Sequence, residues 1–143
     1  MVCIFTFVSL FGSLIFILSS MNIDYHFILS TFHILIIVPF FLYIGFQRSF
    51  APVWIYNATL TIGFIVLLFH GYKLGVRLSR NSEFAWVNAI HVLLVGPLLI
   101  YIGFHKQNTP RMAYELLLML GFAAAGYHLF SLVRMLQMWS KDV

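Results

Sequence analysis

Residues 33–46 read HILIIVPFFLYIGF, and residues 91–104 read HVLLVGPLLIYIGF. The two stretches lie within longer segments, 30–77 and 88–135, which align without a gap at an offset of 58 residues. Fourteen of the forty-eight aligned pairs are identical, and the identical residues include His, Pro, Tyr and Gly. Most of the apolar residues around them differ between the two copies. Self-similarity at a fixed offset predicts that one structural unit occurs twice in the chain.

The composition identifies the class of protein. Hydrophobic residues make up 62% of the chain and charged residues 8%, whereas charged residues are about 25% of an ordinary soluble domain. The only cysteine is Cys3, which excludes an internal disulfide and a cysteine-based metal cluster. These values predict an integral membrane protein, and the net charge of +4 is then a signal of membrane topology and not of nucleic-acid binding.

Five apolar stretches are long enough to cross a bilayer, which requires about 20 helical residues. They lie near 3–20, 26–46, 53–74, 84–104 and 112–136. Backbone amides in lipid must be satisfied within their own segment, so each stretch is expected to be a helix. The sequence therefore predicts an all-α integral membrane fold with five transmembrane helices.

The repeat predicts how these helices are organised. Residues 1–24 form a leading helix outside the repeat, and residues 25–82 and 83–143 each form one helical hairpin. Because each unit holds two spans, both copies enter the membrane in the same orientation, which makes this a parallel repeat. We expect the duplicated hairpins to form a four-helix bundle with the leading helix packed outside it.

Several retained residues recur at three- and four-residue steps, which places them on one face of a helix. Glycine in such a stripe lets a neighbouring backbone approach closely. Pro39 and Pro97 lie inside their helices, so matching kinks are expected at Leu35 and Leu93. The expected helix-interface residues are Pro39, Tyr43, Tyr56, Gly63, Pro97, Tyr101, Tyr114 and Gly121.

Four of the six histidines, His33, His70, His91 and His128, lie within predicted spans as matched pairs. Counted from the hairpin turn, His33 and His70 differ in depth by roughly 6 Å, so each pair fits one layer of the membrane. Three interpretations remain open: the histidines hold haem b as axial ligands, bind zinc or copper, or hydrogen-bond between helices as packing residues.

The charged residues indicate an orientation. With five spans, three basic residues fall on the side of the N-terminus and five on the other, which favours an outside N-terminus and a cytoplasmic C-terminus. The two groups are Arg48, Lys106 and Arg111, and Lys73, Arg77, Arg80, Arg134 and Lys141. Glu115 lies about one turn inside its span. A proton or ion role is one interpretation, and pairing with Arg111 is the favoured one.

The repeated pattern of Pro, Tyr and Gly followed by a turn, Pro, Tyr, Gly and His resembles small, uncharacterised polytopic membrane proteins encoded by large DNA viruses of algae and protists. The likeness covers residues 30–135, and its first copy is carried by Pro39, Tyr43, Gly45, Pro52, Tyr56, Gly63 and His70. It implies a site in an internal virion membrane or a host membrane, and it implies no activity.

No motif of a soluble enzyme is present, whether a phosphate-binding glycine loop, a nucleophile elbow or paired carboxylates. We therefore expect a structural or assembly subunit in the lipid bilayer, as a homo-oligomer or within a larger membrane complex. The alternative is a redox protein that uses the four histidines. A small transporter or channel ranks third, because no ring of polar residues lines a path.

Overall fold

The computed structural model describes residues 25–140; residues 1–24 and 141–143, and with them the predicted span at 3–20, lie outside the described residues. All secondary structure in residues 25–140 is helical. The elements are α2 (Tyr25–Phe32), η1 (His33–Ile37), α3 (Val38–Gln47), η2 (Arg48–Phe50), α4 (Val53–Ser79), α5 (Ala85–Ile90), η3 (His91–Val95), α6 (Gly96–His105), η4 (Lys106–Asn108) and α7 (Arg111–Trp139).

These elements join into four helices that are long and apolar enough to cross a membrane: Tyr25–Phe50, Val53–Ser79, Ala85–Asn108 and Arg111–Trp139. The prediction that these stretches form helices of membrane-spanning length and apolar composition is confirmed for these four. At nearly every end, the helix reaches or passes the last residue of the predicted apolar stretch. The reason is that a helix can continue into the polar residues that flank a hydrophobic segment.

The irregularity expected before each proline takes the form of a π-helix. η1 and η3 are five-residue π segments that end just before the turns holding Pro39 and Pro97. The Val38 N–H donates to the carbonyl of His33, and the Gly96 N–H donates to that of His91, five residues earlier in each case. Proline has no N–H to donate, so widening this turn lets the helix continue without a break.

The long helices pack in an order that crosses the two sequence repeats. α3 packs along α7, and α4 packs along α5 and α6, whereas α3 and α4 make no comparable contact. The two helices within 25–82 are therefore not each other's main partners, and neither are those within 83–143, in contrast to the expected hairpins. The spacing of apolar residues does not specify which helix covers a buried face, so it does not distinguish the two pairings.

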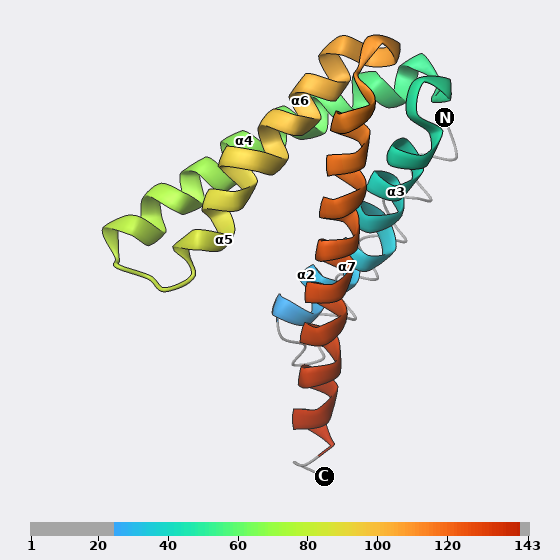
Figure 1. The fold of residues 1–143 in the computed structure, drawn as a ribbon. Coiled ribbons are helices and arrows are strands. Elements are labelled where there is room, and N and C mark those ends of the chain that lie inside the picture. The colour runs from blue at the N-terminus through green and yellow to red at the C-terminus, as the bar shows by residue number, and fades with distance from the viewer. Residues whose placement is uncertain (1–24, 141–143) are drawn as a thin grey trace, which may run out of the picture.

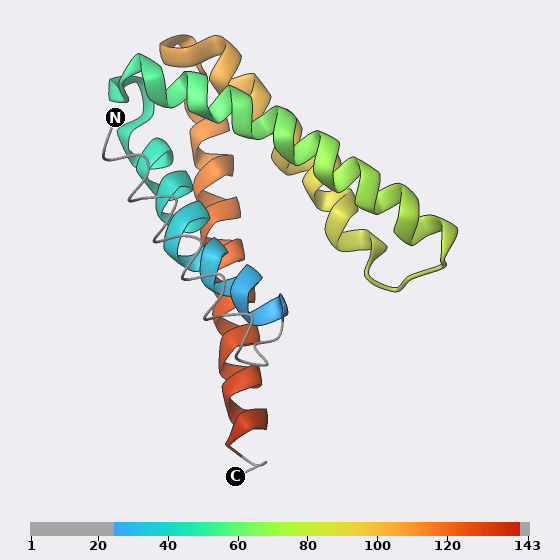
Figure 2. The same ribbon diagram turned by 180° about the vertical axis from the view of Figure 1, so that it is seen from behind.

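Figures 1 and 2 show the two helix pairs, α2–α3 with α7 and α4 with α5–α6, meeting at the turns η2 and η4 and diverging away from them. This is a V-shaped arrangement and not the closed four-helix bundle that we expected. Farther along, Lys73 Nζ of α4 donates to the Tyr25 hydroxyl of α2 at 3.4 Å, a contact between the two pairs.

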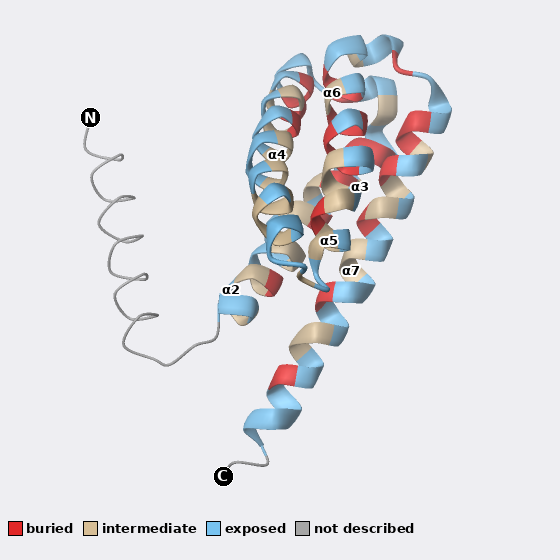
Figure 3. Ribbon diagram, turned by 90° about the vertical axis from the view of Figure 1, so that its left-hand side faces the viewer, coloured by how far each residue is buried: buried red, intermediate tan, exposed pale blue. Residues whose placement is uncertain are grey.

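The buried side chains concentrate where the pairs meet, next to the turns (Figure 3). Tyr56, Ile44, Leu99, Ile102 and Leu117 are almost fully enclosed. Toward the C-terminal end of α7 most residues are exposed (Figure 3). The point of closest packing is therefore one end of the V.

Glycines allow the backbones to approach within each pair. A Cβ built on Gly103 would lie 2.5 Å from the backbone nitrogen of Leu60, and one built on Gly63 would lie 2.9 Å from that of Ile100. Real Cβ atoms do not approach backbone that closely, so α4 and α6 require glycine at these positions. This is the function expected of small residues where membrane helices cross.

Candidate functional site

Tyr56 of α4 and Tyr114 of α7 meet at the closed end of the V. Their hydroxyl oxygens lie 3.1 Å apart, and both side chains are buried. Tyr56 also donates to the carbonyl of Arg48, and Tyr114 donates to the carbonyl of Lys106 at 3.0 Å. The two tyrosines are thus the link between the two helix pairs and the two turns.

This cluster has fewer protons than contacts. Each phenol carries one hydroxyl proton, and a carbonyl oxygen can only accept. Two protons therefore serve three oxygen–oxygen contacts, and at any moment one contact is without a hydrogen. Both hydroxyls can donate to their carbonyls, or either one can donate to the other and leave its own carbonyl without a donor, so three arrangements of the same heavy atoms exist.

The carbonyls that receive these hydroxyls belong to strained residues. Arg48 has a φ of 50° and Lys106 a φ of 52°, values that side-chain-bearing residues rarely adopt. Strain of this kind costs roughly 1–3 kcal/mol per residue and persists where surrounding contacts hold it. The tyrosine hydroxyls are such contacts, because they bond the same residues that carry the strain.

The four intramembrane histidines form two stacked pairs. His33 stacks on His128 with ring centroids 4.3 Å apart and planes 23° apart. His70 stacks on His91 with centroids 4.0 Å apart and planes 8° apart. The layer expected from the sequence thus contains histidine pairs, but each pair joins one residue from each half of the chain, as the helix packing does.

Each imidazole is tethered through Nδ1. His33 Nδ1 donates to the Leu29 carbonyl at 2.8 Å, and His91 Nδ1 donates to the Val87 carbonyl at 2.7 Å. A carbonyl only accepts, so the proton is on Nδ1, and the Nε2 lone pair of both rings points elsewhere. A histidine that ligates a metal through Nε2 has this same tautomer.

His70 and His128 are tethered by side chains that sequence reasoning missed. His70 Nδ1 donates to Asn88 Oδ1 at 3.0 Å, and His128 Nδ1 lies 3.2 Å from Ser30 Oγ. Asn88 and Ser30 are both buried and occupy matching positions in the two repeats. The overlooked signal in the sequence is a polar residue three positions before a histidine in both copies of an apolar helix.

Asn88 also carries the one buried side-chain nitrogen or oxygen without a partner among residues 25–140, its Nδ2. An amide nitrogen left without an acceptor is unfavourable when buried. It lies on the residue that holds His70, so the layer has a spare donor beside one histidine pair and not beside the other.

The stacked geometry does not suit an axial haem site. Two imidazoles that share a haem iron point their Nε2 atoms at it from opposite faces, about 4 Å apart across bonds of roughly 2.0 Å. In both observed pairs the ring faces are in contact instead, which leaves no space for a porphyrin between them. Within residues 25–140 no three His, Cys, Asp or Glu side chains converge on a metal position.

The eight expected interface residues divide into two groups. Tyr56, Gly63, Tyr114 and Gly121 are buried where helices cross. Pro39, Tyr43, Pro97 and Tyr101 lie on exposed faces of their helices. The first helix of each repeat buries its opposite side, including Phe41, Ile44 and Gly45, and their equivalents Leu99, Ile102 and Gly103.

The exposed residues form what we call the outer stripe: Leu35, Pro39, Tyr43 and Phe46, and their equivalents Leu93, Pro97, Tyr101 and Phe104. All four positions are identical in the two halves of the chain. Leu35 and Phe46 are 68% and 65% exposed, and Leu93 and Phe104 are 76% and 73% exposed. The chain therefore repeats a specific apolar surface that its described helices do not cover.

Glu115 pairs with Arg111 four residues before it, with 2.6 Å between Oε1 and Nε. Both side chains are largely exposed, and the pair lies in the first turns of α7. This is the structural interpretation favoured by the sequence. An exposed pair of this kind contributes at most about 1 kcal/mol to stability.

Comparison with protein-family models, with curated proteins and with solved structures finds no match for this chain.

Proposed function

We propose that this protein is a membrane protein built from a duplicated pair of helices and that it acts as a structural or assembly subunit of a membrane complex. The duplication is supported by element bounds that recur at one offset: η1 and η3, α3 and α6, and η2 and η4 match residue for residue. Contacts recur too, since the Tyr56–Tyr114 bond joins equivalent positions 58 residues apart.

The outer stripe is the observation that carries the proposed function. Lipid accepts any apolar side chain, so a lipid-facing surface has no need to retain particular residues. Yet the stripe keeps Leu, Pro, Tyr and Phe in both halves, while neighbouring positions such as Ile36 and Leu94 have diverged. A retained shape on an exposed surface is typical of a site where another helix packs.

Low internal burial supports the same conclusion. In the most apolar window of each long helix, only 17% to 33% of residues are buried within the chain. The diverging pairs therefore leave most side chains to be covered by lipid or by neighbouring subunits. We propose that further copies of this chain cover the outer stripe, because two equivalent stripes let each copy contact two neighbours.

The oligomeric state in mild detergent tests this proposal. Light scattering coupled to size-exclusion chromatography should give a protein mass that is a multiple of the 16.5 kDa chain. Replacing both stripe phenylalanines, Phe46→Ala with Phe104→Ala, should return the mass to one chain. The matched control is Leu68→Ala with Met119→Ala, which removes two equally exposed side chains outside the stripe. A wild-type protein of single-chain mass contradicts self-assembly.

We also propose an outside N-terminus and a cytoplasmic C-terminus. The support is the excess of basic residues on the side of the α4–α5 loop and the end of α7. A membrane-impermeant thiol reagent tests it in intact cells: a cysteine at Ser82 in the α4–α5 loop should be protected, and one at Gln107 in η4 should react. The reverse labelling contradicts this orientation.

A second candidate function is metal-dependent or redox chemistry at the histidine pairs. It is favoured by the contacts at Nδ1, because no Nε2 atom of the four rings has a hydrogen bond to another residue within 25–140. A metal ion bound by one pair would require its stacked rings to rotate until both Nε2 atoms face it. An absorption spectrum before and after dithionite, with elemental analysis, tests this. A Soret band or stoichiometric copper or zinc, lost in His70→Ala, supports it, and a featureless, metal-free protein contradicts it.

A further inference from the structure

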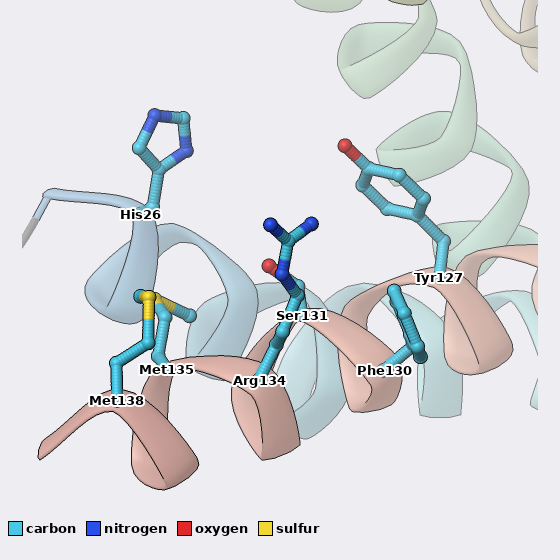
Figure 4. Close-up of a pocket in the computed structure, with 7 residues that line it drawn as sticks. All are labelled: His26, Tyr127, Phe130, Ser131, Arg134, Met135 and Met138. Atoms are coloured by element: carbon cyan, nitrogen blue, oxygen red, sulfur yellow. The ribbon is translucent and has the colours of Figure 1, made fainter. Parts of the chain in front are cut away.

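An open groove of about 240 Å³ lies between the beginning of α2 and the last turns of α7 (Figure 4). Three polar side chains line it from successive turns of α7: Tyr127, Ser131 and Arg134. Their spacing of four and three residues places them on one face of the helix. Figure 4 shows Arg134 and Tyr127 rising from the same side of α7, toward the space where His26 of α2 stands.

Arg134 makes no hydrogen bond or ion pair among the described residues; the one salt bridge there joins Arg111 to Glu115, at the other end of α7. Among residues 25–140, no carboxylate lines the groove. An uncompensated charge near lipid is unfavourable, so an acceptor from outside residues 25–140 is expected for this guanidinium. The acceptor that it suits best is a phosphate, whose oxygens match the two parallel N–H groups of arginine.

Apart from His26, the other residues that line the groove are apolar. Phe130, Met135 and Met138 line it beside the polar residues. Methionine side chains adapt to irregular apolar shapes, as a lipid chain or glycerol backbone requires. A cation and two hydroxyls interleaved with flexible apolar groups match the chemistry of a phospholipid, which combines a charged headgroup with apolar chains.

The depth of the groove agrees with this. Arg134 lies five residues before Trp139, the last residue of α7, which is about 7.5 Å along the helix. Tryptophan marks the membrane interface, and an arginine one or two turns inside extends its side chain toward the headgroups. The guanidinium therefore reaches the layer in which lipid phosphates lie.

The groove is not repeated in the other half of the chain. The residue equivalent to Arg134 is Val76, and the one equivalent to Ser131 is Lys73. Lys73 is already engaged, since its ammonium donates to Tyr25 and lies over the ring of Phe69. The binding surface is consequently present once in each chain.

We infer that this groove binds one anionic phospholipid per chain, with the lipid phosphate on the Arg134 guanidinium and hydrogen bonds from Tyr127 and Ser131. This inference depends on insertion in a membrane and not on self-assembly. The lipid-binding experiment can therefore fail while the proposed oligomer is confirmed, and the reverse is also possible.

Native mass spectrometry of the full chain in detergent, titrated with phosphatidylglycerol, tests the inference. We expect one tightly bound lipid per chain. Arg134→Gln should weaken this binding by about tenfold, the effect of losing a charge-assisted contact to phosphate. Arg80→Gln, which removes an exposed arginine at the end of α4, should leave it unchanged. Equal binding by the two variants, or several equivalent lipids per chain, overturns the inference.

Further measurements distinguish a lipid phosphate from a free phosphate and distinguish loss of binding from misfolding. Excess inorganic phosphate should not displace the lipid, and displacement would show a small-anion site instead. Phosphatidylcholine should bind more weakly than phosphatidylglycerol, and equal binding overturns recognition of an anionic lipid. Tyr127→Phe keeps the ring and removes one donor, so it should weaken binding severalfold with helix content unchanged. Unchanged binding in both Tyr127→Phe and Arg134→Gln also overturns the inference.

Discussion

The hydroxyl oxygens of Tyr56 and Tyr114 lie 3.1 Å apart, although 58 residues separate them in the chain. Each tyrosine also bonds the carbonyl of the turn that precedes its own helix. This four-residue cluster joins both helix pairs at the closed end of the V, and it makes a specific prediction about stability.

Tyr114→Phe should destabilise the protein by about 1 kcal/mol, because the Lys106 carbonyl loses its buried donor. Tyr56→Phe should have a similar effect through the Arg48 carbonyl. The double variant should cost less than the sum of the two, since the shared contact is lost in either single variant. Unfolding in mixed detergent micelles measures all three, and strictly additive losses contradict a direct bond between the hydroxyls.

Gly103→Ala should destabilise the chain by roughly 1–3 kcal/mol, because the new Cβ would meet the backbone of Leu60. Backbone cannot rotate away as a side chain can. Gly71→Ala provides the matched control, because open space surrounds that position. Alanine is a better helix former than glycine, so Gly71→Ala should be neutral or slightly stabilising. Equal losses in the two variants would contradict close packing of α4 on α6.

Arg48→Gly and Lys106→Gly should each stabilise the protein by up to about 1 kcal/mol, because glycine adopts a positive φ without strain. The gain is limited, since glycine also increases the freedom of the unfolded chain. Thermal unfolding of the two variants, with Gln47→Gly as a control at ordinary φ, measures the effect. Destabilisation as large as in the control would show that the turns are not strained.

A disulfide between positions 41 and 121 tests the crossed pairing of helices. A Cβ built on Gly121 lies 3.4 Å from the Cβ of Phe41, close to the roughly 3.5–4.5 Å of a disulfide. In a Cys3→Ser background, Phe41→Cys with Gly121→Cys should therefore cross-link on mild oxidation. Phe41→Cys with Gly63→Cys, which would join the two helices of one repeat, should not. Cross-linking in the second variant and not the first would restore the expected hairpins.

Much of the fold was predictable from length and apolar content, because a bilayer requires helices of a given length wherever such a run occurs. The irregular turns before Pro39 and Pro97 were also predictable, since proline lacks the N–H that an α-helix needs there. The π form of η1 and η3 was not, because several local adjustments satisfy the freed carbonyl equally well.

The partners of the helices were not predictable. Tyr56 and Gly63 mark a buried stripe on α4, but a stripe does not specify which helix covers it. Helices that are apolar on all sides also hide their orientation, which is why Tyr43 and Tyr101 were expected inside and are exposed. Periodicity identifies faces only where the opposite face is polar.

The histidine layer was predictable in its members and not in its pairs. His33 and His128 stack because α3 lies against α7, a tertiary contact. Asn88 and Ser30 were overlooked because small polar residues are common in membrane helices and carry no chemistry alone. Only their position beside a histidine gives them a role.

The crossed packing has a consequence for biosynthesis. Helix α3 finds its partner in α7, whose first residue is made more than sixty residues after α3 ends. During translation, α4 and α5–α6 can pair as soon as both are inserted, while α2–α3 stands alone in the bilayer until the last span leaves the ribosome. Final assembly of this protein is therefore tied to completion of the chain, and a transcript truncated before α7 yields one finished helix pair and one helix without its partner.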